Sequence, residues 1–228
     1  QMRLQDDFIS TISHELRTPL GFIKGYSTTL LRDDTEWDEE TQREFLTIID
    51  EETDHLNDLI GNLLDSARLE SETAEMNFQL MRLDVVIRDV ITRIKAHKKT
   101  IEINFETKDC ELILGDSAML TQIFENLFSN TLKYAPNTPI DIDVSKCNKH
   151  NLQVVFTDYG QGIPEQHLPY IFDRFYRVPG ARNAAGTGLG LFICKQIIKA
   201  HHGKIWAESK EGQGTRFIIQ LPVQATAA

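Results

Sequence analysis

The sequence predicts two domains, an all-α helical hairpin followed by an α+β two-layer sandwich. Up to Leu69, apolar residues recur at helical spacing and strand-like alternation is missing. Beyond residue 75, alternating strands mix with helices without a strict βαβ rhythm. The length of 228 residues also suits two modest domains. We therefore expect one domain at residues 1–72 and a second at 76–228, with Ser71–Ala74 as the linker.

The first domain is predicted to contain two long helices. Apolar positions follow a helical period within Ile9–Leu30, and within Phe45–Leu63 they step by four and three as in a heptad seam. The acidic stretch Arg32–Glu40 separates the two, and Asp38 is a candidate N-cap for the second helix. Because such a hairpin has little core of its own, it predicts a homodimeric four-helix bundle.

The second domain alternates between the two periods. Helices are expected at Asp84–His97, Ser117–Tyr134 and Leu189–His202. Strands are expected around Ile101–Phe105, Ile140–Val144 and Leu152–Phe156, with a turn at Asn148–Asn151, and a final hairpin should pair Lys204–Ser209 with Thr215–Leu221. His201 and His202 precede Gly203, which stands where a C-cap glycine belongs, and positive charge would be favourable at this helix end.

Composition restricts the function. The chain has 24 Lys and Arg against 34 Asp and Glu, a net charge of −10, which argues against nucleic acid and anionic membranes as partners. No apolar run approaches the ~20 residues of a transmembrane helix, and the polar start Gln1–Asp7 is unlike a signal peptide. Cys110, Cys147 and Cys194 form no CxxC pair, and the histidines lack metal-ligand spacing. We expect a cytoplasmic protein with no transition-metal site.

His14 is the first candidate catalytic residue. At about 100° per residue it lies about 200° from the neighbouring seam positions, so it should face solvent. Glu15 follows it directly, Thr18 lies one turn further on the same face, and Pro19 should bend the helix. An imidazole beside a carboxylate can act as a nucleophile, while the carboxylate orients the ring and accepts its proton. The alternative is an ordinary surface histidine.

The second domain offers three pieces of a nucleotide site. Gly186–Gly190 matches neither a P-loop nor G-x-G-x-x-G, but these glycines lead into a helix whose free N–H groups could receive a triphosphate. Asp158 ends a strand, where its carboxylate could accept a hydrogen bond from an adenine amino group. Asn126 and Asn130 form an i,i+4 helical pair that could reach Mg²⁺, and Lys133 could neutralise phosphate. Taken singly, each piece is more often a turn or a solvated helix position.

Ser13–Leu20 resembles the phospho-acceptor box of sensor histidine kinases, and the first domain resembles their dimerisation and histidine-phosphotransfer domain. The resemblance implies that His14 is phosphorylated at a ring nitrogen and that Glu15 is the base or orienting acid. It also implies that Thr18 positions water when the partner protein is dephosphorylated. Arg17 fits an electrostatic aid better than a catalyst.

The second domain resembles the histidine-kinase ATP-binding domain, whose Bergerat-type fold is shared with gyrase and MutL ATPases. Its boxes occur in family order: asparagine box Glu125–Tyr134, first glycine box Asp158–Gly162, phenylalanine box Phe172–Arg177, second glycine box Gly186–Leu191 and third glycine box Gly212–Thr215. Thr131 stands where alanine is common and Ala185 where the family often has glycine. Neither departure removes a required oxygen, charge or N–H group, so the resemblance still implies an active enzyme.

The resemblance implies roles for these residues. Asp158 would contact adenine, Asn130 would coordinate Mg²⁺ with Asn126 assisting, and Val178–Thr187 would be a mobile lid. Thr215 would bridge to adenine through water. The residues implied to bind ATP and Mg²⁺ are Asn126, Asn130, Lys133, Tyr134, Asp158, Gly160, Gly162, Arg177, Gly186, Thr187, Gly188, Leu189, Gly190 and Thr215.

The implied function is ATP-dependent autophosphorylation of His14 in a homodimer, followed by transfer to an aspartate of a response regulator and a phosphatase activity toward that regulator. The chain would be the catalytic core of a longer sensor. Three alternatives stay open: a dimeric scaffold that binds nucleotide without turnover, a gyrase-like or MutL-like ATPase acting on DNA, and a core in which the phosphatase dominates. Intact Asn130 and Asp158 disfavour the first and the acidic charge disfavours the second, whereas Thr18 makes the third feasible.

Overall fold

The computed structural model describes residues 2–70, 76–97, 101–179 and 188–224. The chain divides into two compact units, Gln1–Asp65 and Ser66–Ala228. This division falls within α2 (Glu39–Glu70), shortly before the helix ends. The expected linker Ser71–Ala74 lies outside the described residues, so the boundaries at 72 and 76 stay predictions. Among the described residues, none of the helices is both long enough and apolar enough to span a membrane.

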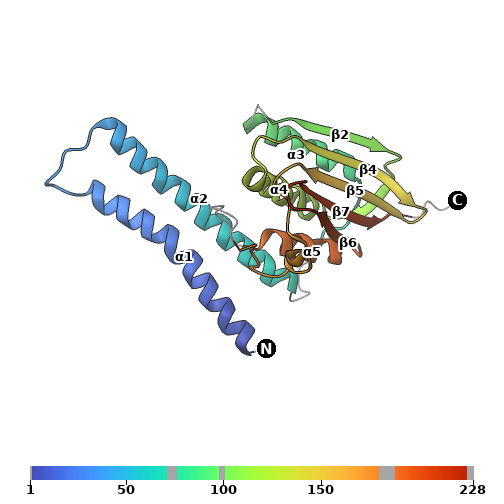
Figure 1. Ribbon diagram of the computed structural model, residues 1–228, viewed down its shortest axis with the longest axis horizontal. Coiled ribbons are helices and arrows are strands. Elements are labelled where there is room, and N and C mark those ends of the chain that lie inside the picture. The colour runs from blue at the N-terminus through green and yellow to red at the C-terminus, as the bar shows by residue number, and fades with distance from the viewer. Residues whose placement is uncertain (1, 71–75, 98–100, 180–187, 225–228) are drawn as a thin grey trace. The chain divides into compact units, whose positions relative to one another are not determined.

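The first unit contains a helical hairpin, as expected. The helix α1 (Met2–Leu30) and the helix α2 run antiparallel, and α1 continues unbroken through Pro19 (Figure 1). Asp38 caps α2, because its Oδ1 accepts a hydrogen bond from the Thr41 N–H at 2.8 Å. The predicted N-cap is therefore confirmed.

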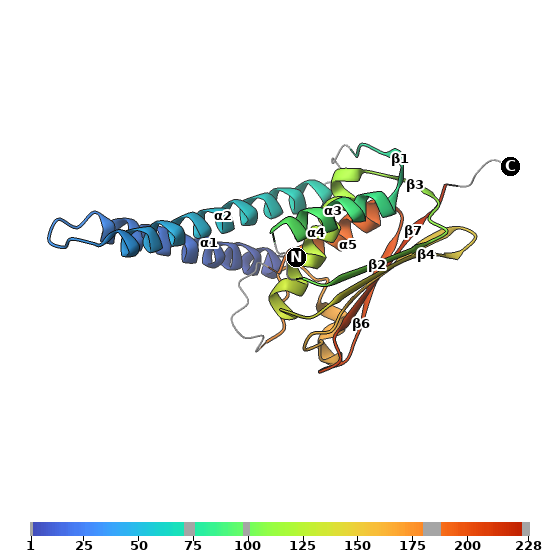
Figure 2. The same cartoon turned by 90° about the horizontal axis from the view of Figure 1, so that it is seen from above.

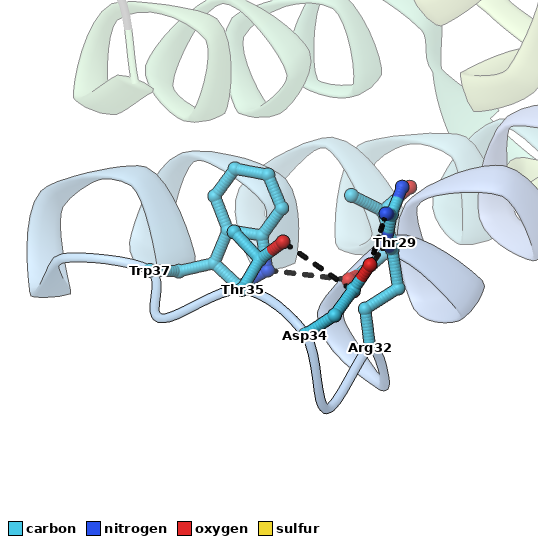
Figure 3. Close-up of polar contacts among 5 residues, drawn as sticks. All are labelled: Thr29, Arg32, Asp34, Thr35 and Trp37. Carbon is cyan, nitrogen blue, oxygen red and sulfur yellow. Dashed lines mark hydrogen bonds and ion pairs between the residues drawn. The ribbon is translucent and has the colours of Figure 1, made fainter.

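Side chains of the connecting loop hold the two helix ends together (Figure 3). The indole N–H of Trp37 donates to the Thr29 carbonyl oxygen at 3.2 Å, which satisfies an acceptor in the last turn of α1. Arg32 donates two hydrogen bonds to Asp34, at 2.8 and 2.6 Å. The Trp37 ring also packs edge-on against Phe45 of α2, with centroids 5.3 Å apart. The loop therefore follows a defined path from α1 to α2.

Much apolar surface of the hairpin is exposed. Two helices cover only one stripe of each other, so residues on other faces of an amphipathic pair stay in contact with solvent. Leu20, expected on the seam, is 57% exposed. The exposed large apolar side chains of the two helices are Leu20, Phe22, Leu46, Ile60 and Leu64. This surface agrees with the expectation that the hairpin has little core of its own.

The second unit is built on a five-stranded sheet in the order β2-β4-β5-β7-β6. Its strands are β2 (Ile103–Lys108), β4 (Ile140–Asn148), β5 (Asn151–Asp158), β6 (Lys204–Ser209) and β7 (Thr215–Pro222). The pair β2–β4 is parallel and the other neighbours are antiparallel. Both predicted hairpins, β4–β5 and β6–β7, are therefore confirmed.

Three helices form the second layer. Figure 2 shows α3 (Leu83–His97), α4 (Ser117–Tyr134) and α5 (Gly190–Ala200) together on one face of the sheet. Phe128 of α4 packs edge-on against Phe156 of β5, with ring centroids 5.1 Å apart and both side chains buried. This contact joins the helix layer to the sheet. The predicted two-layer sandwich is therefore confirmed.

Three short elements were not expected. The strands β1 (Gln79–Arg82) and β3 (Leu112–Gly115) form a separate antiparallel pair, and a 3₁₀ helix, η1, spans Glu165–Tyr170. Four-residue strands are at the lower limit of what alternation can indicate. In this pair Leu80 faces Leu114 across the strands, and both are exposed, so burial does not impose a polar–apolar pattern.

The structure corrects the expectation for His201. The side chain is only 2% exposed, and burial lowers its pKa. Its Nε2 accepts a hydrogen bond from the Asp116 N–H at 2.9 Å, and Nδ1 lies 2.8 Å from the Ile197 carbonyl oxygen. A histidine ring with one acceptor nitrogen and one donor nitrogen is neutral. The expected positive charge at this helix end is therefore wrong for His201. His202 is exposed.

Candidate functional site

The predicted site residues lie in two groups, one in each unit. The first group is on α1, where His14, Arg17 and Thr18 are exposed and Glu15 is partly buried. The exposure of His14 confirms that it faces solvent. The Thr18 hydroxyl donates to the carbonyl oxygen of His14 at 3.2 Å, so the two residues are joined one turn apart. Because it is exposed, the His14 ring is accessible to a reactant, as a nucleophile must be.

The second group gathers around α4. Asp116 fixes the start of this helix, because its Oδ1 accepts from the N–H groups of Ala118 at 3.0 Å and Met119 at 3.2 Å. Its apolar face is buried, with Leu120, Ile123, Phe124, Leu127 and Phe128 in the core. The candidate ligands are less buried: Asn126, Asn130 and Tyr134 are partly buried, and Lys133 is exposed.

Asp158 is the last residue of β5 and is paired with Thr215 at the start of β7. The carboxylate is buried, and its Oδ1 accepts from the Gly160 N–H at 3.0 Å. Burial raises the pKa of Asp158, and the backbone N–H groups of Gly160 and Thr215 partly offset that rise. A buried carboxylate with unused acceptor capacity can bind a planar donor such as an adenine amino group.

Glycines allow the segments around Asp158 to approach closely. A Cβ on Gly160 would lie 2.4 Å from the Cβ of Ala135, directly after α4, and a Cβ on Gly162 would lie 2.2 Å from the Lys210 carbonyl oxygen. A Cβ on Gly214 would lie 2.1 Å from the carbonyl oxygen of Asp158. Real Cβ atoms essentially never come so close, so these positions need glycine. The structure therefore brings α4, the end of β5 and the β6–β7 turn together.

Ser209 belongs to this arrangement, although no sequence motif pointed to it. Its hydroxyl accepts from the Ile163 N–H at 2.8 Å and donates to the Gly214 carbonyl oxygen at 2.7 Å. It also lies 3.0 Å from the Thr215 hydroxyl. Because the Ser209 proton is committed to Gly214, Thr215 is the donor in this contact, which leaves lone pairs of its oxygen for other partners.

The start of α5 forms the remaining side. Gly188 has φ +67°, and its carbonyl oxygen accepts from the Phe175 N–H at 3.1 Å. Leu189, the residue before α5, is buried and makes no side-chain capping hydrogen bond. Arg177 is exposed. Gly186, Thr187 and most of the expected lid, residues 180–187, lie outside the described residues.

Asn126 lies between the two helices of the site. A Cβ on Gly190 would lie 3.3 Å from the Asn126 Oδ1, and the Nδ2 atom is buried without a hydrogen-bond partner among the described residues. Nearby Cys194 is fully buried, which raises its pKa to about 12. The amide thus faces α5, and a part for it in holding Mg²⁺ stays a prediction.

Comparison with known proteins matches both units. Residues 4–72 match the family "His Kinase A (phospho-acceptor) domain", and residues 115–225 match "Histidine kinase-, DNA gyrase B-, and HSP90-like ATPase". The sensor protein kinase WalK of Staphylococcus aureus is 36% identical over an alignment of 228 positions, which covers 97% of this chain and 54% of that relative. The chain therefore spans about half of the length of this relative.

Two solved structures extend the match. The catalytic domain of histidine kinase ThkA is 32% identical, with TM-score 0.55 over 64% of this chain and 96% of that domain. ThkA in complex with the response regulator protein TrrA has TM-score 0.74 over 98% of this chain and 63% of that one, at 24% identity. The second likeness extends the shared fold over nearly the whole chain.

Proposed function

The chain belongs to the histidine kinases, and from this premise we propose that it uses ATP to phosphorylate His14 and then transfers the phosphoryl group to an aspartate of a response regulator. The observation that carries the proposal is the presence of two complementary sites in one chain. One is the exposed His14 ring with Glu15 beside it, and the other is the buried Asp158 carboxylate framed by glycines. The first suits a nucleophile and the second suits a purine nucleotide.

In the proposed nucleotide site, Asp158 accepts from the adenine amino group, and Thr215 accepts from a bridging water with its free lone pairs. Lys133 and Arg177 supply positive charge to the phosphates. The start of α5, where the described residues provide no side-chain cap, would direct its first backbone N–H groups and the positive end of its dipole toward the same oxygens. Adenine and triphosphate would thus be recognised by different elements.

In the proposed reaction, one ring nitrogen of His14 attacks the γ-phosphorus of ATP. The new P–N bond forms as the bond from phosphorus to the β,γ-bridging oxygen breaks, and ADP leaves. The proton on the other ring nitrogen passes to a carboxylate, for which Glu15 is adjacent in sequence. In the second step the phosphoryl group moves from the ring nitrogen to a carboxylate oxygen of the regulator. Positioning and charge neutralisation supply most of the acceleration in such transfers.

The residues present fit a magnesium ion that arrives with the nucleotide. The described residues contain no group of three or more His, Cys, Asp or Glu side chains that could cage a metal. Asn130 offers one hard carbonyl oxygen on α4, which suits an ion that keeps phosphate oxygens and waters as its other ligands. When bound, Mg²⁺ would neutralise charge on the phosphate oxygens.

We also propose that the hairpin pairs with a second copy to form a four-helix bundle. Supporting this are the exposed apolar side chains of α1 and α2, which include Leu20 and Leu64. Residues 1–72 would form the phosphotransfer domain and residues 76–228 the ATP-binding domain. The regulator would then dock beside His14 on the outside of the bundle.

The test is incubation of the purified chain with [γ-³²P]ATP and Mg²⁺. We expect base-stable, acid-labile label on the wild type and its loss in His14→Gln. A matched control is His55→Gln on α2, since His55 also has an acidic neighbour, with Nδ1 3.7 Å from Glu52; this variant should keep the label. Label that persists in His14→Gln, or a wild type that binds ATP without becoming labelled, contradicts the proposal. Multiple-turnover hydrolysis stimulated by DNA would favour the gyrase-like or MutL-like alternative.

A further inference from the structure

We propose that Arg174 is a positioning residue for the nucleotide site, which links Phe175 to Phe192 through its guanidinium group and thereby fixes the start of α5. The inference rests on the proposed function and adds a residue to which no role was assigned. Arg174 itself need not contact the nucleotide. Its effect would pass through α5, whose first backbone N–H groups are proposed to bind phosphate.

The guanidinium group of Arg174 lies near two aromatic rings at once. Its Cζ is 5.5 Å from the ring centroid of Phe175 and 5.7 Å from that of Phe192. Both distances are within the range at which a cation is attracted by the face of a ring. Phe192 is buried and belongs to the first turn of α5, whereas Phe175 lies just beyond η1. Arg174 therefore connects the segment after η1 to the beginning of α5.

Phe175 needs such support, because its backbone has φ +62°. A bulky aromatic residue seldom adopts this left-handed conformation, and it persists only where surrounding contacts hold it. The first of these contacts is the hydrogen bond from its N–H to the Gly188 carbonyl oxygen at 3.1 Å. Gly188 is pressed against it so closely that a Cβ there would lie 2.6 Å from the Phe175 carbonyl carbon. The Arg174 guanidinium near the Phe175 ring is a further contact.

The two helices of the site differ in how their starts are fixed. α4 has the Asp116 carboxylate as a cap, which accepts from two backbone N–H groups. Among the described residues no side chain caps α5, and its first turn contains no acidic residue. The positive end of its dipole can attract an anion, but no capping side chain among the described residues fixes its position. In the proposed arrangement, contacts from Arg174 and Phe175 fix the start of α5 in place of a capping side chain.

The test compares Arg174→Met with Arg88→Met in the full chain. The Arg88 guanidinium lies 4.7 Å from the Phe105 ring, so this control loses a similar contact on α3 and β2. Dissociation constants are measured by calorimetry with Mg²⁺ for adenosine, ADP and a non-hydrolysable ATP analogue, together with thermal midpoints. Arg174→Lys keeps the charge but lacks the planar group that can face both rings.

We expect Arg174→Met to weaken binding of the ATP analogue about tenfold, as expected for loss of a cation–ring contact. ADP should be affected less and adenosine hardly at all, because adenine is bound at Asp158, and Arg174→Lys should be intermediate. Arg88→Met should leave all three constants unchanged. Equal losses for adenosine and the ATP analogue would indicate general destabilisation and overturn the inference, as would unchanged binding.

If Arg174→Met does not fold, Phe192→Leu removes one of the two rings and should give the same phosphate-dependent loss. Unchanged nucleotide binding by Phe192→Leu would overturn the inference in that case. A wild type that binds none of the three ligands would overturn the proposed function together with this inference. If the wild type binds these ligands and both Arg174→Met and Phe192→Leu bind them equally well, the inference is overturned and the proposed function stands.

Discussion

The backbone N–H of Asp116 donates a hydrogen bond to Nε2 of His201 at 2.9 Å, although 85 positions separate the two residues in sequence. Asp116 also caps α4, and the Asn77 N–H donates to its Oδ2 at 2.9 Å. The His201 ring stacks edge-on against Phe78, with centroids 5.2 Å apart. One buried histidine thus ties the end of α5 to the start of α4 and to the segment that enters the sandwich.

This arrangement predicts a loss of stability in mild acid. In the unfolded chain the ring titrates at about 6.5, and burial lowers the folded pKa, although the hydrogen bond to Ile197 and the charge of Asp116 oppose this and His202 adds to it. Between the two pKa values the unfolded state binds more protons, so the free energy of unfolding falls as pH drops below about 6.5. Urea unfolding at pH 7.5, 6.5 and 5.5 measures it. His201→Gln should lose about 1–3 kcal/mol at pH 7.5 and much of this pH dependence.

The neighbouring histidine provides the control for that measurement. His202 is exposed and has φ +58°, a conformation that asparagine tolerates. His202→Asn should therefore keep the stability at pH 7.5 and most of its dependence on pH, because burial rather than His202 is the main cause of the lowered His201 pKa. An undiminished fall in stability between pH 7.5 and 5.5 in His201→Gln would assign the effect to other groups.

Asp158→Asn should separate stability from binding. Burial raises the folded pKa of Asp158, so its contribution to stability is fully present below the unfolded pKa, near ~3.9, and is lost as pH rises through the folded pKa. At pH 7 the ionised group is therefore unfavourable, and its neutral isostere should unfold at an equal or higher temperature. Nucleotide affinity should nevertheless fall at least about tenfold, because the amide presents donors toward the adenine amino group.

Thermal unfolding and calorimetric ADP binding of Asp158→Asn check both parts. Gln153→Asn on the same strand, where the amide accepts from Gln220 at 3.0 Å, is a control that should leave ADP affinity unchanged. Retained ADP affinity in Asp158→Asn would exclude the carboxylate from the adenine site.

Most of the fold could be predicted from periodicity. The helix expected at Ser117–Tyr134 has these same bounds as α4, because its apolar positions form one long buried face. The β1–β3 pair was missed since Leu80, Leu112 and Leu114 are apolar yet exposed, so burial does not impose an alternating pattern there. Pairing between short, distant segments depends on tertiary contacts, which local patterns do not encode.

The site was predictable in part. Asp158 and the glycines stand in recognisable motifs, because close backbone approach restricts their residue type. Ser209 has no such restriction: its place in the site comes from a hydrogen bond with Ile163, 46 positions away. The charge of His201 was misjudged for a related reason, since burial and the Asp116 N–H, not its position at a helix end, determine its protonation.

Trp37→Phe should destabilise the hairpin by about 1 kcal/mol, the usual contribution of one hydrogen bond. The variant keeps a ring for contact with Phe45 but leaves the Thr29 carbonyl oxygen without the indole N–H. Urea unfolding followed by circular dichroism at fixed protein concentration measures the change. Trp206→Phe is the matched control, because its indole makes only an exposed 3.4 Å contact with Glu208. Equal effects of the two substitutions would contradict the role given to Trp37.

Thr18→Ala should reduce dephosphorylation of the regulator at least about tenfold while leaving phosphorylation of His14 within about twofold. The Thr18 proton is donated to the His14 carbonyl oxygen, so its remaining lone pairs face solvent and can orient an attacking water. Alanine favours helix, so α1 should stay folded. Thr28→Ala is the control, because Thr28 makes the same kind of hydrogen bond, to Lys24 at 2.7 Å, three turns away. The rates of both reactions are measured for each variant. Thr18→Ser should restore dephosphorylation of the regulator. Equal losses of both activities in Thr18→Ala would show that the hydroxyl only shapes the helix around His14.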